Sequence, residues 1–431
     1  MRTMQSHIAG KFRGWVQAVA AVMLASVVAA CGGGGGDSSS SNSSNTLNGG
    51  SLPASPTQQP IAANAANTVP ITVGRGVNGV INIPTVSVTV CPPGTTSNCQ
   101  KIDNIQVDTG SFGLRLVSSV LNTSLLAALP VSTLSGGAQL AECATFADGF
   151  TWGTVRTATI QIGGETTAAI PVQIIGDSAA GAVPSGCGSG PADNTATALG
   201  ANGILGIGTA LTDCGATCST PSTAANFSNY FTCPGGTCAR ATVPLNQQVA
   251  NPAANFAADN NGVIVQMPPV SNTGAASATG TLVFGITPPG TQSNNALAAA
   301  QTFTTDTFGN MNNSVFNGTT VQAFFDSGSN AYFFADSSLA QCGSNFAGFY
   351  CPSSAQTRSI TLGGLSSTRA SVSIGILSAS TLFGNTSNFA FNDLAGQIGG
   401  SSSFDLGLPF FYGRYVYYGF ATGGQAPYVG F

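Results

Sequence analysis

The sequence predicts an all-β fold of two lobes with a few short helices. From Val69 onward, runs of β-branched and apolar residues alternate with Gly, Pro and Asn, which is the pattern of short strands joined by tight turns. An acidic turn followed by a glycine-containing apolar stretch occurs once in each half of the chain. The 431 residues, 43% of them hydrophobic, are enough to fill two lobes rather than one.

The individual elements are expected to be short. β-Branched residues predict strands at residues 71–73, 80–83, 86–90, 155–162 and 172–175. Helical patterns cover only residues 118–129, 244–256 and, more weakly, 337–342. Periodicity alone does not distinguish a sandwich, a barrel and a two-lobed protein, so the choice of two lobes depends on the repeated sequence pattern.

Two four-residue signatures carry this repeat. Each follows an apolar, strand-like run and leads into another, and together they contain the only two Asp-Ser/Thr-Gly triplets in the sequence. The members are Asp108, Thr109, Gly110 and Ser111 in the first signature and Asp326, Ser327, Gly328 and Ser329 in the second. One such signature alone is an ordinary turn. A matched pair suits chemistry in which two Asp share a proton and activate water.

An apolar stretch with a glycine follows each signature. Residues 203–206 read Gly-Ile-Leu-Gly, and residues 404–411 read Phe-Asp-Leu-Gly-Leu-Pro-Phe-Phe. A glycine at this place lets the backbone pass close beside the acidic loop, where any Cβ would crowd it. Two buried strands with incidental glycines are the alternative for either stretch alone, but the same order in both halves favours a site.

The composition narrows the possible chemistry. The single histidine, His7, lies in a segment expected to be removed, which excludes histidine-based triads, Cys-His dyads and the usual His-rich metal sites. Lysine occurs only at Lys11 and Lys101, so catalysis depends on carboxylates, hydroxyls or thiols. Beyond residue 30, eight basic and fifteen acidic residues give a net charge of about −7. Nucleic acid is therefore not expected as a partner.

The N-terminus predicts export. Residues 1–30 combine three basic residues with an apolar run that is slightly shorter than the roughly 20 residues of a membrane span, as in a signal peptide. The run ends at Cys31 in a sequence that resembles the lipobox of bacterial lipoproteins, in which this Cys is lipidated. An uncleaved membrane anchor is the alternative. Gly32, in place of an Asp retention signal, favours the outer membrane, at its periplasmic face or at the cell surface.

The remainder divides into a tether and two lobes. Residues 31–66 comprise the lipidated Cys and a Gly-, Ser- and Asn-rich segment, which we expect to be a flexible tether of about 30 Å. Residues 67–286 are expected to form the N-terminal lobe and residues 287–431 the C-terminal lobe.

Ten cysteines follow Cys31, and an even number in an exported chain predicts up to five disulfides. A zinc site built from four of them is the alternative, but no two cysteines have the two-residue spacing of a zinc ribbon or knuckle. The expected pairs are the local Cys91–Cys99, Cys233–Cys238 and Cys342–Cys351, then Cys143–Cys187, which leaves Cys214–Cys218.

Together these features resemble the pepsin-like aspartic peptidases. The signatures at Asp108 and Asp326 match the two active-site signatures of that family, and residues 203–206 and 404–418 resemble its apolar-apolar-Gly elements. Residues 280–285 and 428–431 resemble strands of the sheet between its lobes, so the resemblance covers residues 69–431. It implies a bilobal β fold with one catalytic Asp from each lobe at a substrate cleft, and no metal or cofactor.

The resemblance also assigns roles to the neighbours of the two Asp. Thr109 and Ser327 would tie the two loops together, while Ser111 and Ser329 would donate hydrogen bonds to the outer carboxylate oxygens.

The chain departs from the family pattern in three places. A hairpin within residues 143–164 parallels the flap that covers substrate, but Phe146 stands where a Tyr is expected. Trp152 either supplies the missing polar group or packs the hairpin. Arg115 stands where the family keeps a Trp, and it favours an ionised Asp108 only if it points inward. The tether also contains no basic pro-segment.

These observations predict an aspartic-type endopeptidase of the bacterial envelope that acts on polypeptides and is attached to the membrane through Cys31. The alternative is a catalytically inactive lipoprotein of the same fold that binds a peptide, a glycan or a protein partner. The intact Asp pair favours the peptidase, whereas the altered flap and the missing pro-segment favour the binding protein.

Overall fold

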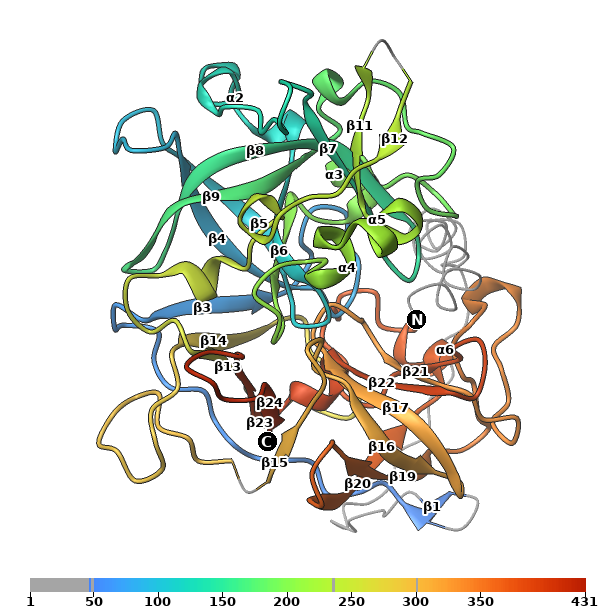
Figure 1. Cartoon of the computed structure of the whole chain (residues 1–431). Helices are drawn as coiled ribbons and strands as arrows, with labels where there is room; N and C mark the ends of the chain where they lie inside the picture. Colours follow the sequence, from blue (N-terminus) through green and yellow to red (C-terminus); the bar gives the residue numbers. More distant parts are fainter. Residues whose placement is uncertain (1–45, 48–49, 235–236, 300) are drawn as a thin grey trace.

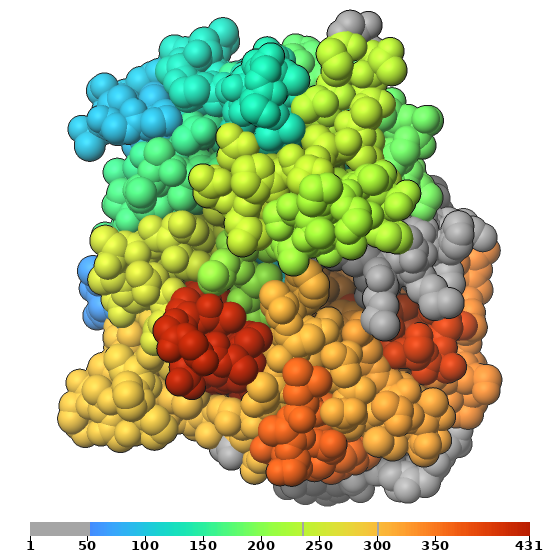
Figure 2. Space-filling model, viewed as in Figure 1, coloured from blue at the N-terminus to red at the C-terminus, as the bar shows by residue number. Residues whose placement is uncertain are grey.

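The computed structural model describes residues 46–47, 50–234, 237–299 and 301–431. This part of the chain is mostly β with a few short helices, which confirms the predicted fold class. We call residues 67–286 the N-terminal half and residues 287–431 the C-terminal half. Most of the N-terminal half lies above the C-terminal half in Figures 1 and 2, where the colours run from blue through green to gold in the N-terminal half and on to orange and red in the C-terminal half.

The strands of the N-terminal half are β3 (Thr68–Val73), β4 (Pro84–Cys91), β5 (Gln100–Asp108), β6 (Phe112–Val117), β7 (Leu140–Thr145), β8 (Phe150–Ile162), β9 (Glu165–Ile175), β10 (Gly203–Ile207), β11 (Tyr230–Thr232), β12 (Ala239–Arg240), β13 (Gly262–Met267) and β14 (Ala278–Phe284). Those of the C-terminal half are β15 (Thr302–Thr304), β16 (Met311–Phe316), β17 (Thr319–Asp326), β18 (Tyr332–Phe334), β19 (Gln356–Gly363), β20 (Arg369–Ile376), β21 (Ala395–Gly396), β22 (Ser403–Gly407), β23 (Arg414–Gly419) and β24 (Tyr428–Gly430). A separate short pair, β1 (Thr46–Leu47) and β2 (Gly50–Ser51), precedes both halves.

The strands form two large sheets. A 15-stranded sheet has the order β12-β11-β7-β8-β9-β6-β10-β5-β4-β3-β14-β13-β23-β24-β15, and a 7-stranded sheet has the order β20-β19-β16-β17-β22-β18-β21. The larger sheet contains strands of both halves, because β13 pairs with β23 over six residue pairs from Gly262–Gly419 to Met267–Arg414. The two halves are therefore joined by backbone hydrogen bonds and not only by side-chain packing.

The α-helices of the described residues are all short: α2 (Thr123–Ala128), α3 (Ala196–Leu199), α4 (Ala216–Ser219), α5 (Pro221–Phe227) and α6 (Ala379–Leu382). Within the described ranges, every helix is too short or too polar to cross a membrane.

Three helical predictions need correction. The segment 118–129 is a 3-10 turn at Ser118–Val120 followed by α2. The Asn122 side chain caps the N-terminus of α2 by accepting a hydrogen bond from Leu125 N at 2.8 Å. The segment 244–256 breaks into two 3-10 turns because the residue before Pro252 is held in an extended conformation. Residues 337–342 form no helix.

One strand prediction was wrong, while β3, β4, β8 and β9 confirm the others. Residues 80–83 form a turn, and the buried Asn82 adopts a left-handed backbone with φ of 50°. Its side-chain amide donates hydrogen bonds to the carbonyl oxygens of Asn330 and Phe391 at 2.8 and 2.9 Å. An Asn tolerates this conformation, and its hydrogen bonds to the other half stabilise it.

The expected repeat is present as a repeated strand topology. In the N-terminal half, β10 lies parallel to β5 and antiparallel to β6, and Gly206 is the partner of Asp108. In the C-terminal half, β22 lies parallel to β17 and antiparallel to β18, and Gly407 is the partner of Asp326. Each acidic signature thus stands at the end of a strand, next to the glycine of the apolar stretch that follows it.

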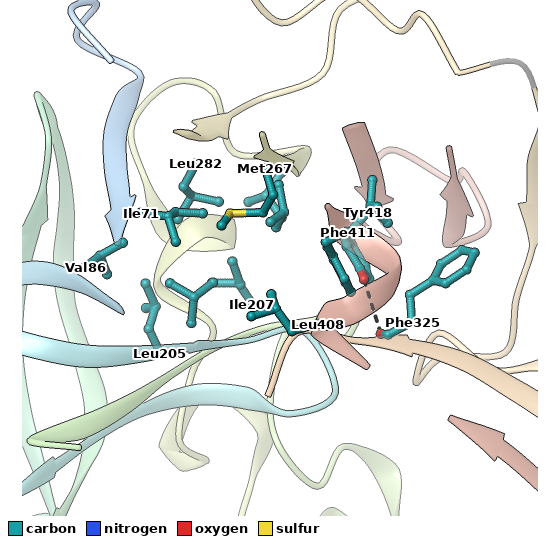
Figure 3. Close-up of a cluster of buried hydrophobic side chains, with 14 of the residues drawn as sticks. Ile71, Val86, Leu205, Ile207, Met267, Leu282, Phe325, Leu408, Phe411 and Tyr418 are labelled. Atoms are coloured by element: carbon teal, nitrogen blue, oxygen red, sulfur yellow. Dashed lines mark hydrogen bonds between the residues drawn. The ribbon is translucent and has the colours of Figure 1, made fainter. Parts of the chain in front are cut away.

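A continuous hydrophobic core lies beneath the two signatures and crosses the boundary between the halves. In Figure 3, Ile207 of the N-terminal half lies beside Leu408 of the C-terminal half, with Leu205 and Phe411 of the same core farther out on either side. All four side chains are fully buried. Because protein cores are close-packed, this shared core fixes the two loops above it relative to one another.

The last part of the expected tether is attached to the shared sheet. The backbone N–H of Gln58 donates to Gly413 O at 3.0 Å, and its side-chain oxygen accepts from Tyr415 N at 3.0 Å. Ile61 N donates to Gln266 Oε1 at 2.9 Å, and Ile61 O accepts from Thr281 Oγ1 at 2.6 Å. The prediction of a flexible tether is therefore wrong for residues 58–66, because hydrogen bonds attach this segment to the sheet.

All five predicted disulfides are present: Cys91–Cys99, Cys143–Cys187, Cys214–Cys218, Cys233–Cys238 and Cys342–Cys351. The Cys143–Cys187 bridge closes a 44-residue separation and ties β7 to the segment that follows β9. The predicted signal peptide and the predicted lipidation site, Cys31, lie outside the described residues.

The close approach at Gly407 gives a stability prediction. A Cβ at Gly407 would lie 2.1 Å from Ala331 O and 2.7 Å from Ser329 O, both backbone atoms that cannot move aside cheaply. We expect Gly407→Ala to lower the free energy of unfolding by about 1–3 kcal/mol, as measured by urea denaturation. Gly343→Ala is the matched control, since a Cβ there meets nothing within 4 Å. Equal stabilities of the two variants would contradict the prediction.

Candidate active site

The first signature forms a loop that directs two hydrogen-bond donors at one carboxyl group. Asp108 is the last residue of β5 and is buried. Its Oδ1 accepts from the backbone N–H of Gly110 at 2.9 Å, and its Oδ2 accepts from the Ser111 hydroxyl at 2.5 Å. Hydrogen bonds of this kind stabilise the ionised carboxylate.

The second signature repeats this arrangement. Asp326 is the last residue of β17. Its Oδ1 accepts from Gly328 N at 2.8 Å, and its Oδ2 accepts from the Ser329 hydroxyl at 2.9 Å. Both carboxyl groups are therefore held in fixed orientations by donors from their own loops.

Thr109 and Ser327 clamp the two loops together by reciprocal hydrogen bonds. The backbone N–H of Thr109 donates to Ser327 Oγ at 3.2 Å, and the backbone N–H of Ser327 donates to Thr109 Oγ1 at 2.8 Å. Each hydroxyl then donates across the boundary to a strand carbonyl, Thr109 to Phe325 O at 3.3 Å and Ser327 to Val107 O at 2.8 Å. The four bonds are buried, so they fix the relative position of the two loops.

The clamp brings the two Asp side chains into contact. A Cβ at Gly110 would lie 2.6 Å from Asp326 Cγ, and a Cβ at Gly328 would lie 2.5 Å from Asp108 Oδ1. Each carboxyl group thus faces the glycine of the opposite loop, and the two carboxyl groups are hydrogen-bonded to each other. Only glycine leaves room for this approach.

The pair cannot carry two negative charges easily. Burial raises the pKa of Asp326 to about 8, and the charge of Asp108 and the hydrogen bond with it act in the same direction. The donors Ser329 and Gly328 oppose this shift only partly. One proton therefore stays on the pair over a wide pH range, as expected for like charges at a shared site.

A cavity of about 420 Å³ opens above the pair, between the two halves. Asp108, Gln106 and Ile204 line it from the N-terminal half, and Asp326 and Asp405 from the C-terminal half. Gln106 also bridges the halves, because its Nε2 donates to Gly328 O at 3.0 Å. The cavity is large enough for a few side chains of a bound polymer, with the Asp pair at its floor.

The β7–β8 hairpin carries the turn expected to act as a flap. Phe146 and its two successors in this turn line the cavity, and Phe146 N donates to Gly149 O at 2.8 Å. Trp152 does not line the cavity. Its indole N–H donates to Gly181 O at 3.1 Å, and its ring packs against Phe231 at 5.7 Å. Of the two interpretations of Trp152, the structure supports hairpin packing.

Arg115 points inward, but its charge is paired with acids other than Asp108. Its guanidinium is 3% exposed and lies 2.7 Å from Glu142 Oε1 and 3.3 Å from Asp213 Oδ2. It also donates to Phe112 O at 2.8 Å. Arg115 thus points inward, one of the two expected orientations, but its charge is paired with two acids, one from β7 and one from the loop after β10. Local sequence did not indicate either acid as its partner.

Three site residues were not predicted as such. Tyr418 places its hydroxyl 3.0 Å from Thr109 Oγ1 and 3.2 Å from Phe325 O, directly behind the clamp (Figure 3 shows the second contact). Gln106 and Asp405 line the cavity. Asp405 stands inside one of the apolar stretches that the sequence singled out, so a carboxyl at an otherwise apolar position was the available signal.

No group of three or more His, Cys, Asp or Glu residues in the described ranges is arranged to hold a metal ion.

Comparisons with known proteins complete the description. Residues 63–431 match the family model DUF3443, described as a protein of unknown function. The structure is similar to that of the aspartic proteinase from Irpex lacteus, with 17% sequence identity, coverage of 85% of this chain and 97% of that chain, and a TM-score of 0.48. A search of curated proteins finds no match.

The buried acids predict how stability depends on pH. The pKa is raised by burial to about 8 for Asp326 and to about 7 for Asp393, so the folded chain holds more protons than the unfolded chain between about pH 4 and pH 8. We expect these groups to make the free energy of unfolding fall as pH rises through this range. Urea denaturation of the wild type and Asp326→Asn measures the effect, and the slope should be smaller in the variant.

The control for this measurement is Asp103→Asn. The Ser87 hydroxyl holds the pKa of Asp103 below its usual value, so this group loses its contribution only at more acidic pH. The wild type and Asp103→Asn should show the same slope between pH 5 and pH 8. An unchanged slope in Asp326→Asn would mean that Asp326 titrates normally.

Proposed function

We propose that this chain, which belongs to the DUF3443 family of proteins of unknown function, is an aspartic-type endopeptidase. The observation that carries the proposal is the pair of clamped carboxyl groups, Asp108 and Asp326, in contact at the floor of a cavity between the halves. One proton on such a pair provides a general acid and a general base in the same site.

The geometry supports a division of roles. Asp326 keeps the shared proton up to about pH 8, because burial and the charge of Asp108 raise its pKa. Asp108, with Gly110 N and the Ser111 hydroxyl directed at it, is the carboxylate. Asp108 takes a proton from a water molecule held between the two groups, and the water oxygen bonds to the peptide carbonyl carbon while Asp326 donates its proton to the carbonyl oxygen.

The second step completes the hydrolysis. The tetrahedral diol that results collapses when the C–N bond breaks, the nitrogen takes the proton from Asp108, and a diol hydroxyl returns its proton to Asp326. The products are a carboxylic acid and an amine, and the site regains its single proton. No cofactor takes part.

The β7–β8 hairpin is the element suited to cover a bound polypeptide. Its turn residue Phe146 lines the cavity. The ring of Phe146 also makes a cation–π contact with Arg115, whose Cζ lies 5.8 Å from the ring centroid. A closing hairpin excludes water and positions the substrate. Phe146 supplies no hydroxyl, and this single feature favours the second candidate, a protein of the same architecture that binds a peptide without cleaving it.

The cell envelope is the proposed location, with residues 1–30 as a signal peptide and a lipid on Cys31 as the anchor. Five disulfides in the described chain support an oxidising compartment. The basic residues before the apolar run and the small residues before Cys31 support processing at this Cys.

The proposal predicts acid peptidase activity that depends on both Asp. We expect the full chain, purified in a mild detergent, to cleave unfolded protein at acidic pH and to be blocked by a statine-type inhibitor, whose hydroxyl replaces the attacking water. Asp108→Asn and Asp326→Asn should each lower kcat/KM by about 10²–10⁴-fold, because each removes one partner of the proton transfers. Release of peptides, followed by mass spectrometry, is the measurement.

Asp103→Asn is the control, since this exposed acid lies outside the cavity and pairs with Lys101 at 3.3 Å. It should retain the wild-type rate. Absence of cleavage from acidic to neutral pH, together with peptide binding that is lost on substitution of cavity residues, would replace the peptidase with the binding protein.

A further inference from the structure

The two halves carry different side chains at one pair of equivalent positions, and both side chains line the cavity. Ile204 on β10 is the register partner of Gln106, two residues before Asp108. Asp405 on β22 is the register partner of Phe324, two residues before Asp326. The repeated topology therefore places an apolar side chain on one side of the Asp pair and a carboxyl group at the equivalent position on the other.

One oxygen of the Asp405 carboxyl is buried without a hydrogen-bond partner in the described part of the chain. The residue is only 5% exposed, and this oxygen is Oδ1. Burial raises the pKa of Asp405 well above its usual range, and the nearby charge of Asp326 adds to the shift, while a hydrogen bond with Ser329 opposes it. A buried carboxyl oxygen without a partner costs free energy, so a donor that arrives with a ligand would remove this cost.

The charges around the cavity favour a cation as that partner. Five Asp line the cavity, and no Lys or Arg is among the lining residues that the structure describes; the five are Asp108, Asp148, Asp193, Asp326 and Asp405. A low-dielectric cavity lined by one sign of charge concentrates ligands of the opposite sign.

The wall beside Asp405 suits the apolar stem of such a side chain. Phe333 on β18 is the cross-strand partner of Asp405 and also lines the cavity, together with Phe349. A Lys or Arg side chain buries its methylene groups against apolar surface while its charged end meets an acid. An aromatic ring beside the charged end adds a cation–π attraction.

We propose that Asp405 determines specificity by accepting a basic side chain of the substrate, Lys or Arg, on the C-terminal-half side of the Asp pair. This proposal rests on the proposed peptidase function and names its substrate class: polypeptides with a basic residue beside the bond that is cleaved. Ile204 leaves the opposite side of the pair to an apolar side chain.

The test uses pairs of fluorogenic peptides that differ only by Lys or norleucine, placed on either side of the scissile bond in turn. For one of the two positions, the full chain should cleave the Lys peptide with a kcat/KM at least about tenfold higher. Asp405→Ile, which copies the N-terminal half, and Asp405→Asn should both abolish this preference. Both should still cleave the norleucine peptide, because the Asp pair is intact.

Three controls keep the outcomes separate. Ile204→Val changes the equivalent position without a change of charge and should keep the Lys preference. Thermal unfolding of each variant shows whether it is folded, and a Glu-containing peptide should be the poorest substrate of the wild type. Equal preferences in the wild type and in both Asp405 variants would overturn the role of Asp405.

Failure of the peptidase function is distinguishable from failure of this inference. If the wild type cleaves no peptide, the same Lys and norleucine peptides are tested for binding by calorimetry. Tighter binding of the Lys peptide that disappears in Asp405→Ile would support the basic subsite in a binding protein. Cleavage without any Lys preference would leave the peptidase intact and overturn the subsite.

Discussion

The reciprocal hydrogen bonds between Thr109 and Ser327 are the constraint on which the rest of the site depends. Two carboxyl groups from distant parts of the chain repel each other when ionised, and nothing in either loop alone would keep them together. The clamp offsets this repulsion with buried hydrogen bonds in which each loop donates to and accepts from the other. Tyr418 supports it from behind with a hydroxyl 3.0 Å from Thr109 Oγ1.

The clamp itself depends on how the two halves are joined. The strands β13 and β23 pair across the boundary, and the hydrophobic core beneath the loops is continuous from one half to the other. The segment around Gln58 and Ile61 adds hydrogen bonds to the outside of the same shared sheet. The site is therefore built on a rigid base, and the β7–β8 hairpin is the neighbouring element that meets the cavity only through its turn.

The symmetry of the two loops does not extend to the side chains beside them. Both signatures direct the same donors at their Asp, but Ile204 and Asp405 occupy equivalent positions on the two sides of the pair. Ser329 contacts Asp405 as well as Asp326, whereas the hydroxyl of Ser111 serves Asp108 at 2.5 Å. A repeated fold with unequal side chains can thus hold two similar acids in different environments.

Much of this protein was predictable from local sequence. Runs of β-branched residues predicted four of the strands, and the paired signatures identified Asp108 and Asp326. The even number of cysteines in a chain predicted to be exported led to the five disulfides, four of them between cysteines close in sequence. Asn82 and residues 244–256 were mispredicted, because a contact with Asn330 and the position of Pro252 override the local pattern.

Only the tertiary structure decided which charges meet. The acids that pair with Arg115 come from β7 and from the loop after β10. The Trp152 ring is buried against Phe231, which lies far from it in sequence. Whether the two Asp touch, and which of them keeps the proton, depends on burial and on distances between segments more than 200 residues apart. Sequence determines the local hydrogen-bonding and hydrophobic pattern of each strand and loop, whereas electrostatic interactions act through space and depend on where the folded chain places them.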